Sequence, residues 1–156
     1  MDDATLHLEE FLPYRLARAA EIVSRDFAAL YHGRYGLTRP EWRVFATIGQ
    51  FGTITATAIG VHSSMHKTKV SRAVSSLEKR RWIVRAADAG DRRVEHLSLT
   101  REGRERYRDL TLVARRYESE LVRAIGPDAA KRLDGALKAL ERFDRSAGAH
   151  SNLSAN

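Results

Sequence analysis

One pair of short strand-like segments interrupts a chain whose apolar residues otherwise recur at helical spacing. The first, 82–85, is rich in aromatic and β-branched residues, and in the second, 94–99, apolar and polar residues alternate as they do in a strand with one buried face. The stretch between them contains Gly90 and is short enough for the turn of a hairpin. Such a chain folds into a mostly helical (α+β) domain that carries one two-stranded ribbon.

Apolar residues three and four apart predict six helices around this hairpin. These cover residues 12–31, 38–49, 55–59, 67–81, 100–125 and 127–146. The second begins with a capping box, because the Thr38 hydroxyl precedes the Glu41 carboxylate by three residues. Thr55 caps the third helix, which we expect Gly60 and Val61 to break. The residues just before it can form only a short strand.

The composition bounds the class of protein. The 156 residues suit one domain of ordinary size, or one domain with dimerising arms. The absence of cysteine excludes disulfides, zinc–thiolate sites, thiol nucleophiles and a thiol-oxidation trigger in this chain. No apolar run approaches the roughly 18 residues of a membrane span, and the acidic N-terminus resembles no secretory or transit signal. These features fit a cytoplasmic protein.

The net charge of +7 is concentrated in one segment, from His62 to Arg108. This segment contains 13 lysines and arginines against six acidic residues, and the charges of the remaining chain cancel. A surface that serves only solubility usually intersperses charges of both signs. A module that binds a polyanion, flanked by neutral elements of assembly, has the distribution seen here. We therefore expect the central segment to bind nucleic acid.

The helix predicted over 67–81 carries side chains suited to reading DNA. Its apolar residues, Val70, Ala73, Val74 and Leu77, share one face. The other face carries short polar and basic side chains, which can approach base edges in the major groove and hydrogen-bond to them. The residues assigned to DNA binding here are Lys67, Thr68, Lys69, Ser71, Arg72 and Ser75, with Ser64 and His66 in the preceding turn.

The hairpin tip carries a second group assigned to DNA binding. Arg92 and Arg93 follow Gly90, and a protruding arginine suits the narrow, electronegative minor groove. Asp91 would repel a phosphate, so we expect its carboxylate to pair with Arg93 and fix the direction of that guanidinium. Helix, turn, helix and two-stranded ribbon together form a winged helix-turn-helix.

Three blocks of this sequence resemble the MarR family of bacterial transcriptional regulators, in the family's order and spacing. Residues 37–44, Leu-Thr-Arg-Pro-Glu-Trp-Arg-Val, look like the entry to the family's second helix. Residues 67–79 resemble its recognition helix, and 91–93 with 97–103 resemble its wing and the start of the next helix. The resemblance covers about residues 8 to 145. It departs at Arg80-Arg81, where the family usually has Lys-Gly; arginine is electrostatically favourable there, but the glycine of a helix cap is missing.

The resemblance implies an intertwined homodimer whose first and last helices interlock and whose paired recognition helices read a palindromic operator. The implied organisation is a dimerisation helix over 1–36, a DNA-binding lobe over 37–100, dimerisation helices over 101–146 and a flexible tail over 147–156. The implied function is that of a sequence-specific regulator, a repressor that a small aromatic or phenolic ligand releases. It requires neither a cofactor nor a metal.

Aromatic and cationic residues near the first two helices could bind such a ligand. An aromatic carboxylate requires an apolar slot with one fixed guanidinium, and Arg15 beside Tyr14 offers that arrangement. The candidate residues are Tyr14, Arg15, Arg18, His32, Tyr35, Trp42 and Arg43. A ligand between Arg15 and Trp42 would favour a lobe spacing that no longer matches the two half-sites. In the alternative, Trp42 belongs to the core, and Arg15 and Arg18 are solvated or pair with Glu21.

Other classes of function have less support. An architectural protein that coats DNA by charge alone is an alternative, although coating requires only Lys and Arg, not a compact polar face. A ligand sensor whose main partner is another protein leaves the +7 segment unexplained. The sequence contains no nucleophile elbow, Walker loop or dinucleotide fingerprint, so we expect no enzyme. His62 and His66 straddle a predicted turn without a metal-binding motif, so we expect no metal there.

Overall fold

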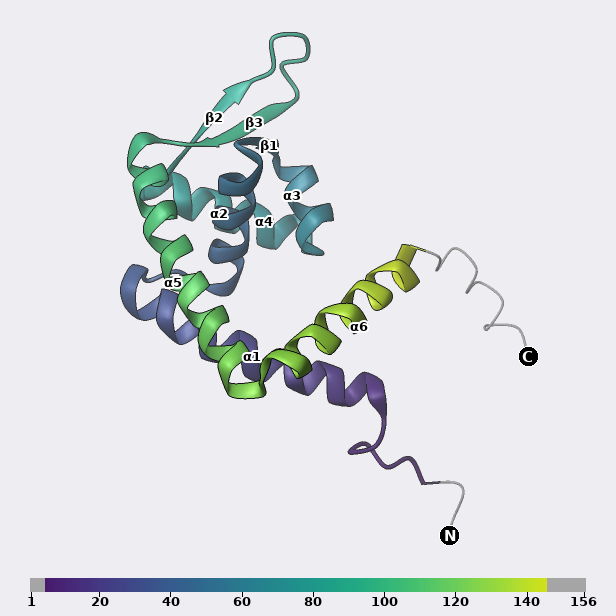
Figure 1. The fold of residues 1–156 in the computed structure, drawn as a ribbon. Coiled ribbons are helices and arrows are strands. Elements are labelled where there is room, and N and C mark those ends of the chain that lie inside the picture. Colours follow the sequence, from purple (N-terminus) through teal and green to yellow (C-terminus); the bar gives the residue numbers. More distant parts are fainter. Residues whose placement is uncertain (1–4, 146–156) are drawn as a thin grey trace, which may run out of the picture. The chain divides into compact units, whose positions relative to one another are not determined.

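The computed structural model describes residues 5–145, which form six helices and three strands (Figure 1). The elements are α1 (Leu12–Tyr35), α2 (Arg39–Phe51), β1 (Thr53–Thr55), α3 (Ala56–Ser63), α4 (Lys67–Lys79), β2 (Ile83–Ala87), β3 (Glu95–Leu99), α5 (Arg101–Ile125) and α6 (Pro127–Arg145). The prediction of a mostly helical fold with one hairpin is therefore confirmed. The predicted tail, 147–156, lies outside the described residues.

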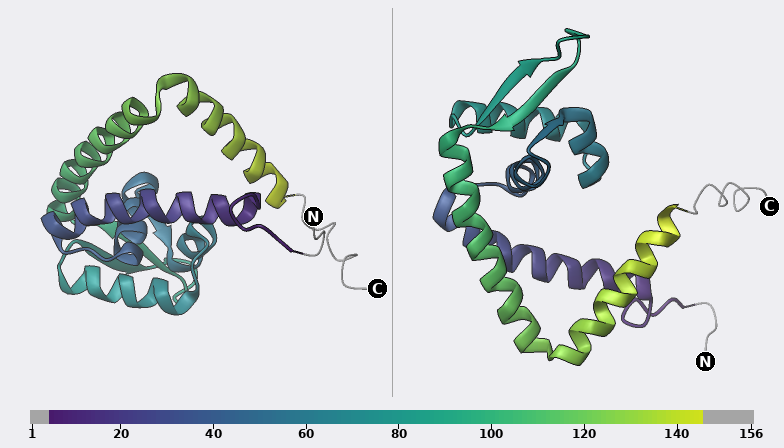
Figure 2. Two further views of the ribbon diagram at one scale, coloured as in Figure 1. Left: turned by 90° about the horizontal axis from the view of Figure 1, so that it is seen from below. Right: turned by 45° about the horizontal axis from the view of Figure 1, so that its top comes forward.

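The three strands form a small antiparallel sheet in the order β1-β3-β2. β2 and β3 make the hairpin, with Ile83 opposite Leu99 at its base and Ala87 opposite Glu95 near its tip. β1 adds three residues along the other side of β3. The hairpin extends away from the helices in Figure 1 and in the right-hand view of Figure 2. Its tip is therefore placed to contact another molecule.

Local sequence sets the end of the first helix and the start of the second. α1 extends beyond its predicted end at residue 31 to Tyr35, and Gly36 follows it with a φ of 65°, a left-handed conformation that favours glycine. The Thr38 side chain accepts a hydrogen bond from the Glu41 backbone N–H, and the Glu41 carboxylate accepts one from the Thr38 N–H at 2.8 Å. This reciprocal pair confirms the capping box and fixes the start of α2.

The predicted end of the third helix is wrong. α3 continues through Gly60 and Val61 to Ser63, and Ser64 ends it in the left-handed conformation with a φ of 52°. A glycine inside a helix costs only about 1 kcal/mol relative to alanine. Here it permits a close approach, since a Cβ on Gly60 would lie 3.1 Å from the Met65 carbonyl oxygen. Tight packing at the turn before α4 therefore outweighs the helix-breaking tendency.

The core lies between α2, α3, α4 and the inner face of the sheet. Its buried apolar residues are Tyr31, Leu37, Val44, Phe45, Ile48, Ile59, Val70, Ala73, Val74, Leu77, Trp82, Ile83, Leu97, Leu99 and Leu110. α5 begins directly against this core, because a Cβ on Gly103 would collide with the Trp82 carbonyl oxygen. The buried faces of α2 and α4 are those that the helical spacing predicts.

The chain divides into two compact units, Met1–Ala114 and Arg115–Asn156, with the division inside α5. The first unit contains α1, the sheet and the helices around it; the second contains the end of α5 and α6. On α6, Leu133, Leu137 and Leu140 are 41–46% exposed, so this unit leaves an apolar stripe uncovered. In the part of the chain that the structure describes, every helix is too short or too polar to cross a membrane.

Candidate nucleic-acid interface

α4 separates its side chains into a buried and an exposed face. Its four apolar residues pack against α2 and α3. The polar residues assigned to base reading lie on the solvent side, with Ser75 half-buried at the margin. The exposed ones are Lys67, Thr68, Lys69, Ser71 and Arg72. The first two turns of α4 are therefore accessible to a partner along their polar side.

Ten of the 13 basic residues of the central segment fall into two groups. Five are bonded within the lobe: Arg80, Arg85, Arg101, Arg104 and Arg106. Arg85, for example, donates to Glu78 at 2.8 Å and to Glu95 at 3.0 Å, and these bonds raise its pKa. Within residues 5–145, the cations assigned to DNA binding form no ion pair. These are Lys67, Lys69, Arg72, Arg92 and Arg93.

An aspartate that sequence reasoning missed organises the hairpin tip. Asp88 Oδ1 accepts hydrogen bonds from the backbone N–H groups of Gly90 at 2.8 Å and Asp91 at 3.0 Å. Its Oδ2 lies 2.9 Å from His96 Nε2 on β3. The bond with His96, followed by the two backbone bonds, lowers the pKa of Asp88 to about 2. The signal was available, since aspartate two residues before glycine is typical of a side-chain-capped turn.

The expected side-chain pair of Asp91 and Arg93 is wrong. Asp91 Oδ1 instead accepts a hydrogen bond from the backbone N–H of Arg93 at 2.9 Å, and the described structure contains no ion pair between the two side chains. A short carboxylate reaches its neighbouring backbone amides at little entropic cost. Asp91 thus shapes the backbone of the tip and leaves the exposed guanidinium groups of Arg92 and Arg93 uncompensated.

α4 is capped without the glycine that the resemblance leads one to expect. Arg81 adopts the left-handed conformation with a φ of 60°. Its N–H donates to the Glu78 carbonyl at 2.8 Å, and the Trp82 N–H donates to the Leu77 carbonyl at 3.1 Å. This pair of bonds is the Schellman motif, in which a left-handed residue ends the helix. An arginine here occupies a conformation that normally favours glycine.

Arg80, next to this cap, joins α4 to the end of α1. Its Nη1 donates to the Tyr35 carbonyl and its Nη2 to the Gly36 carbonyl, both at 2.9 Å. The same guanidinium lies 3.8 Å from the buried Glu41 carboxylate and above the Trp82 ring. The last carbonyls of a helix lack partners within that helix, so Arg80 satisfies the end of α1. Its charge serves the fold.

The turn before α4 adds further polar groups to the exposed side. Ser64 and His66 are exposed, and His66 is the N-cap residue of α4. With Arg43 and Lys69, they line a cavity of about 300 Å³. In the described residues, no group of three or more His, Cys, Asp or Glu side chains could hold a metal ion. The turn therefore extends the cationic face of α4 towards α2.

The structure places Trp42 and Arg43 beside an aromatic cluster. Trp42 stacks on Tyr31, with ring centres 5.6 Å apart, and meets the Phe27 ring edge-on at 5.1 Å. Trp42 and Arg43 line a cavity of only about 80 Å³. Sites for small molecules usually have 300 Å³ or more. Within a single chain, this position is therefore too small for an aromatic acid.

The other residues expected at the ligand site lie elsewhere. Tyr14 and Arg18 contact each other near the start of α1, at 5.9 Å between guanidinium and ring. Arg15 is 12 residues from Phe27, which is about 18 Å along a helix, so one chain does not bring Arg15 to Trp42. The remaining contacts are Glu21 with Arg39 at 2.8 Å, His32 with the Leu37 carbonyl at 3.3 Å, and Tyr35 with Arg34 at 5.6 Å.

Known proteins are similar to this chain in sequence and in fold. A model of the MarR family matches residues 35–94. The MarR family transcriptional regulator SPO1453 from Silicibacter pomeroyi DSS-3 is 30% identical, and its crystal structure aligns with a TM-score of 0.78 over 89% of this chain and 98% of that one. The transcriptional repressor CouR, solved bound to a 23-mer DNA duplex, is 26% identical, with a TM-score of 0.77 over 88% of this chain and 99% of its own.

A curated relative gives a shorter match. The HTH-type transcriptional regulator YwoH of Bacillus subtilis (strain 168) is 25% identical over 88 residues, which are 56% of this chain and 64% of that protein. This match spans slightly less than two thirds of that relative's length. The similarity to SPO1453, by contrast, extends over nearly its whole chain. The lobe with its exposed α4 and projecting hairpin, the family match and this identity agree: the chain belongs to the MarR family of DNA-binding transcriptional regulators.

Proposed function

We propose that this protein binds a specific palindromic operator in duplex DNA as a homodimer, represses transcription there, and releases the operator when a small ligand binds. α4 would lie in the major groove, and Arg92 and Arg93 at the hairpin tip would enter the adjacent minor groove. The turn with Ser64 and His66 would contact the DNA backbone.

The observation that carries this proposal is the division of the cations. Those on the first turns of α4 and at the hairpin tip have no acidic partner in the described lobe, whereas Arg80 and Arg85 on its other parts are bonded. Exposed, unpaired cations beside short hydroxyl side chains suit both phosphate contact and base reading. CouR, a repressor with the same fold, was solved with a DNA duplex, which supports this use of the lobe.

A fluorescence anisotropy titration at near-physiological salt tests the DNA partner. It compares a duplex library from the genomic regions flanking the protein's own gene with shuffled duplexes of equal length. A preference of about a thousandfold or more is expected for a specific regulator. Equal and steeply salt-dependent binding to every duplex would instead favour an architectural, largely non-specific DNA-binding protein.

The homodimer is supported by apolar side chains that a single chain leaves uncovered. On α1, Leu12 and Leu16 are 66% and 36% exposed, and on α6, Leu137 is 41% exposed. We expect light scattering to give twice the mass of the chain. Leu137→Glu is expected to yield monomer or to unfold, and circular dichroism separates those two results. A variant that stays fully dimeric would place the interface elsewhere.

Repression and its relief need a cellular readout. A reporter driven by the bound operator is expected to be silenced by the wild-type protein and to recover with Arg93→Ala. A reporter that falls when the gene is removed would identify an activator. Release by a ligand would operate by selecting a lobe spacing that no longer fits half-sites about one helical turn apart.

A further inference from the structure

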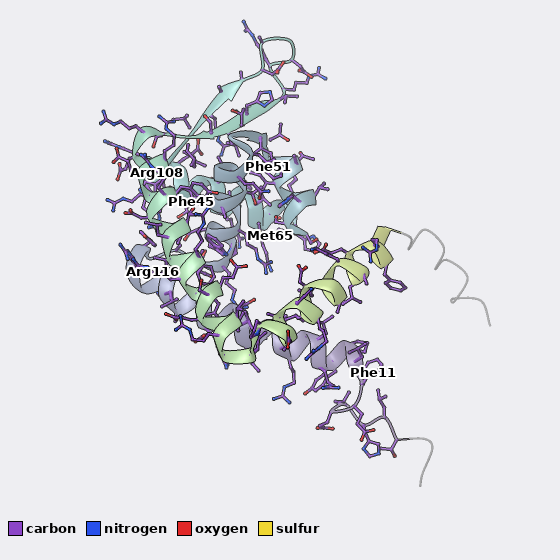
Figure 3. The ribbon with its side chains drawn as sticks, viewed as in Figure 1. Phe11, Phe45, Phe51, Met65, Arg108 and Arg116 are labelled. Atoms are coloured by element: carbon purple, nitrogen blue, oxygen red, sulfur yellow. The ribbon has the colours of Figure 1, made fainter. Side chains whose placement is uncertain are left out.

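The loop at the hairpin tip, residues 88–94, has little support from the helices of the lobe. In Figure 3 the tip and its side chains project beyond Phe51 of α2 and Arg108 of α5. Arg92 and Arg93, which we assign to the minor groove, are exposed in this loop. An ordered loop loses less conformational freedom when it binds than a disordered one does. Because the tip projects away from the helices, bonds within the hairpin must supply that order.

A series of hydrogen bonds runs from β3 through the loop to Arg93. His96 Nε2 on β3 lies 2.9 Å from Asp88 Oδ2. Asp88 Oδ1 accepts a bond from the Asp91 N–H at 3.0 Å, and Asp91 Oδ1 accepts one from the Arg93 N–H at 2.9 Å. The Asp88 N–H also donates to the Val94 carbonyl at 2.9 Å. The backbone position of Arg93 therefore depends, through two aspartates, on His96.

The pair of Asp88 and His96 changes its charge near neutral pH. Histidine is the side chain that ordinarily gains or loses its charge between pH 5 and 8. Asp88 stays ionised across that range, because its bonds with His96 and with two backbone N–H groups lower its pKa to about 2. A neutral imidazole can keep this hydrogen bond in one tautomer, but an imidazolium adds the attraction of opposite charges. Both side chains are partly exposed, 34% for His96 and 39% for Asp88, so solvent protons reach the pair.

On the sheet and in the loop, Asp88 is the ionic partner of His96. The cross-strand neighbours of His96 are Thr55 on β1 and Ala86 on β2, and neither is ionisable. The charged residues of the strands, Arg85 and Glu95, lie on the other face of the sheet and are bonded to each other. In the loop, the Asp91 carboxylate is bonded to a backbone N–H, and Arg92 and Arg93 form no ion pair in the part of the chain that the structure describes.

The ionisable residues of the helices packed against β3 are engaged elsewhere. On α3 this residue is His62, whose ring meets the Phe51 ring edge-on. On α2, Arg39 is bonded to Glu21, Glu41 is bonded to the Thr38 N–H, and Arg43 lines the cavity before α4. Arg104 and Arg108 of α5 line a cleft at the far end of β3, with Ser98 and Leu99. Within residues 5–145, His96 therefore acts on the loop through Asp88 alone.

We propose that His96 is a positioning residue for the DNA-binding hairpin, which orders the tip more strongly when its imidazole is protonated, so that operator affinity rises as the pH falls from 8 to 6. The protonated imidazole strengthens the bond that holds Asp88, and Asp88 holds the loop. An ion pair that is partly exposed contributes little, so we expect an effect of about three- to fivefold for each hairpin that contacts DNA. The use of operator affinity as the output rests on the proposed function.

The ratio of operator affinity at pH 6 to that at pH 8, from fluorescence anisotropy at fixed salt, tests the proposal. Asp88→Asn keeps an oxygen that can accept from the backbone N–H groups of the loop, but removes the charge that pairs with His96. We expect Asp88→Asn and His96→Gln each to lower the ratio by about threefold or more, and the double variant to lower it no further. Comparing ratios cancels the gain in affinity, equal at both pH values, from removing a negative charge near DNA.

His66 provides the matched control, because it is exposed on the reading face and also changes its charge in this range. The factor that His96→Gln removes from the ratio should be the same in wild type and in His66→Gln, since the two histidines act independently. Two results would overturn the proposal. One is a wild-type ratio in His96→Gln. The other is a wild-type ratio in Asp88→Asn, which would mean that His96 acts on DNA by its own charge.

A measurement without DNA separates this proposal from the proposed function. Carbon-13 relaxation of the Cα groups of residues 88–93 reports the order of the loop on the fast timescale, and solvent exchange does not affect it. Order should be higher at pH 6 than at pH 8 in the wild type, and equal at the two pH values in His96→Gln. Equal order in the wild type would overturn the positioning role. A pH-dependent loop in a protein without operator preference would leave that role standing and contradict the proposed function.

Discussion

The two ends of α4 carry the same kinds of residue and use them differently. At its start, Lys67, Lys69 and Arg72 are exposed and have no ionic partner among the described residues. Just after its end, Arg80 is bonded to the Tyr35 carbonyl at the end of α1 and to the Gly36 carbonyl that follows it, and Arg85 is held between two glutamates. Basic residues are dense along the whole segment, yet only part of that charge is available to a partner.

This difference shows that the basic residues of a segment should first be separated into those bonded within the chain and those without a partner. Only then can they be assigned to DNA binding. In a guanidinium that donates to carbonyls or carboxylates of its own chain, the N–H groups that a phosphate or base would need are already hydrogen-bonded. In a free guanidinium on a face of small hydroxyl side chains, they are not. The comparison predicts opposite phenotypes at the two ends: loss of binding at the start of α4 and loss of stability at its end.

Arg72→Ala is expected to have the largest effect on binding. Arg72 is exposed on the polar face of α4, and a good contact between arginine and a base edge is worth about 1–3 kcal/mol. Operator affinity should fall by about one to two orders of magnitude, with the melting temperature and the dimer unchanged. Fluorescence anisotropy at constant salt measures it. Arg106→Ala, already paired with Glu102, is the matched control and should bind like wild type.

Arg80→Ala should show the reverse. Removing this guanidinium leaves the Tyr35 and Gly36 carbonyls at the end of α1 without their donor. Because hydrogen bonds from charged donors are strong and these are partly exposed, we expect a loss of about 1–2 kcal/mol in the free energy of unfolding. Urea unfolding measures it. The folded variant should retain its operator affinity within a few-fold; a binding loss equal to that of Arg72→Ala would contradict the division.

Glu41 extends the comparison to pH. Burial alone would raise the pKa of this carboxyl, but hydrogen bonds from Ser76 and Thr38 and the charge of Arg80 outweigh it, so the pKa is lowered. The ionised form therefore stabilises the fold above the ordinary carboxyl pKa, and this contribution is lost as the pH falls through the acid range. Glu41→Gln should cost about 1 kcal/mol at pH 7, since a charged acceptor is replaced by a neutral one.

Urea titrations of wild type and Glu41→Gln at pH 7 and pH 3.5 check this sign. The wild type should lose more stability than the variant between the two values, so the gap between them narrows in acid. Parallel losses in the two proteins would mean that Glu41 does not carry the pH dependence of the junction between α1, α2 and α4.

Local rules account for what the sequence predicts well. The capping box at Thr38 depends on residues within four positions, and it lies where expected. The exposed face of α4 follows from helical spacing in the same way. The end of α3 could not be predicted from local sequence. Gly60 stays within the helix because it packs against the Met65 carbonyl, a contact formed only when the chain turns into α4.

The site shows the same limit. Which residues could contact DNA follows from spacing and chemistry, but which charges are already bonded depends on partners far along the chain. Arg80 reaches back 45 residues to Tyr35, and no local pattern records that contact. The contact of Arg85 with Glu95 is easier to infer from the sequence, because strand alternation places both residues on the same side of the hairpin. Within one chain, Arg15 does not come together with Trp42, because it lies about 18 Å along α1 from Phe27, the residue that contacts Trp42.

The smallest expected effect concerns Arg81, the residue that ends α4. Arg81 ends α4 with a φ of 60°, which costs a side-chain-bearing residue roughly 1 kcal/mol relative to glycine. Glycine also gains freedom in the unfolded chain, so Arg81→Gly should stabilise the fold by only about 0.5 kcal/mol. Urea unfolding in replicate measures it. Arg81→Ala is the control, because it removes the charge and keeps the strained backbone, and it should leave stability unchanged or slightly lower. An equal increase in the free energy of unfolding for glycine and alanine would show that the arginine side chain, and not its backbone conformation, destabilises this end of α4.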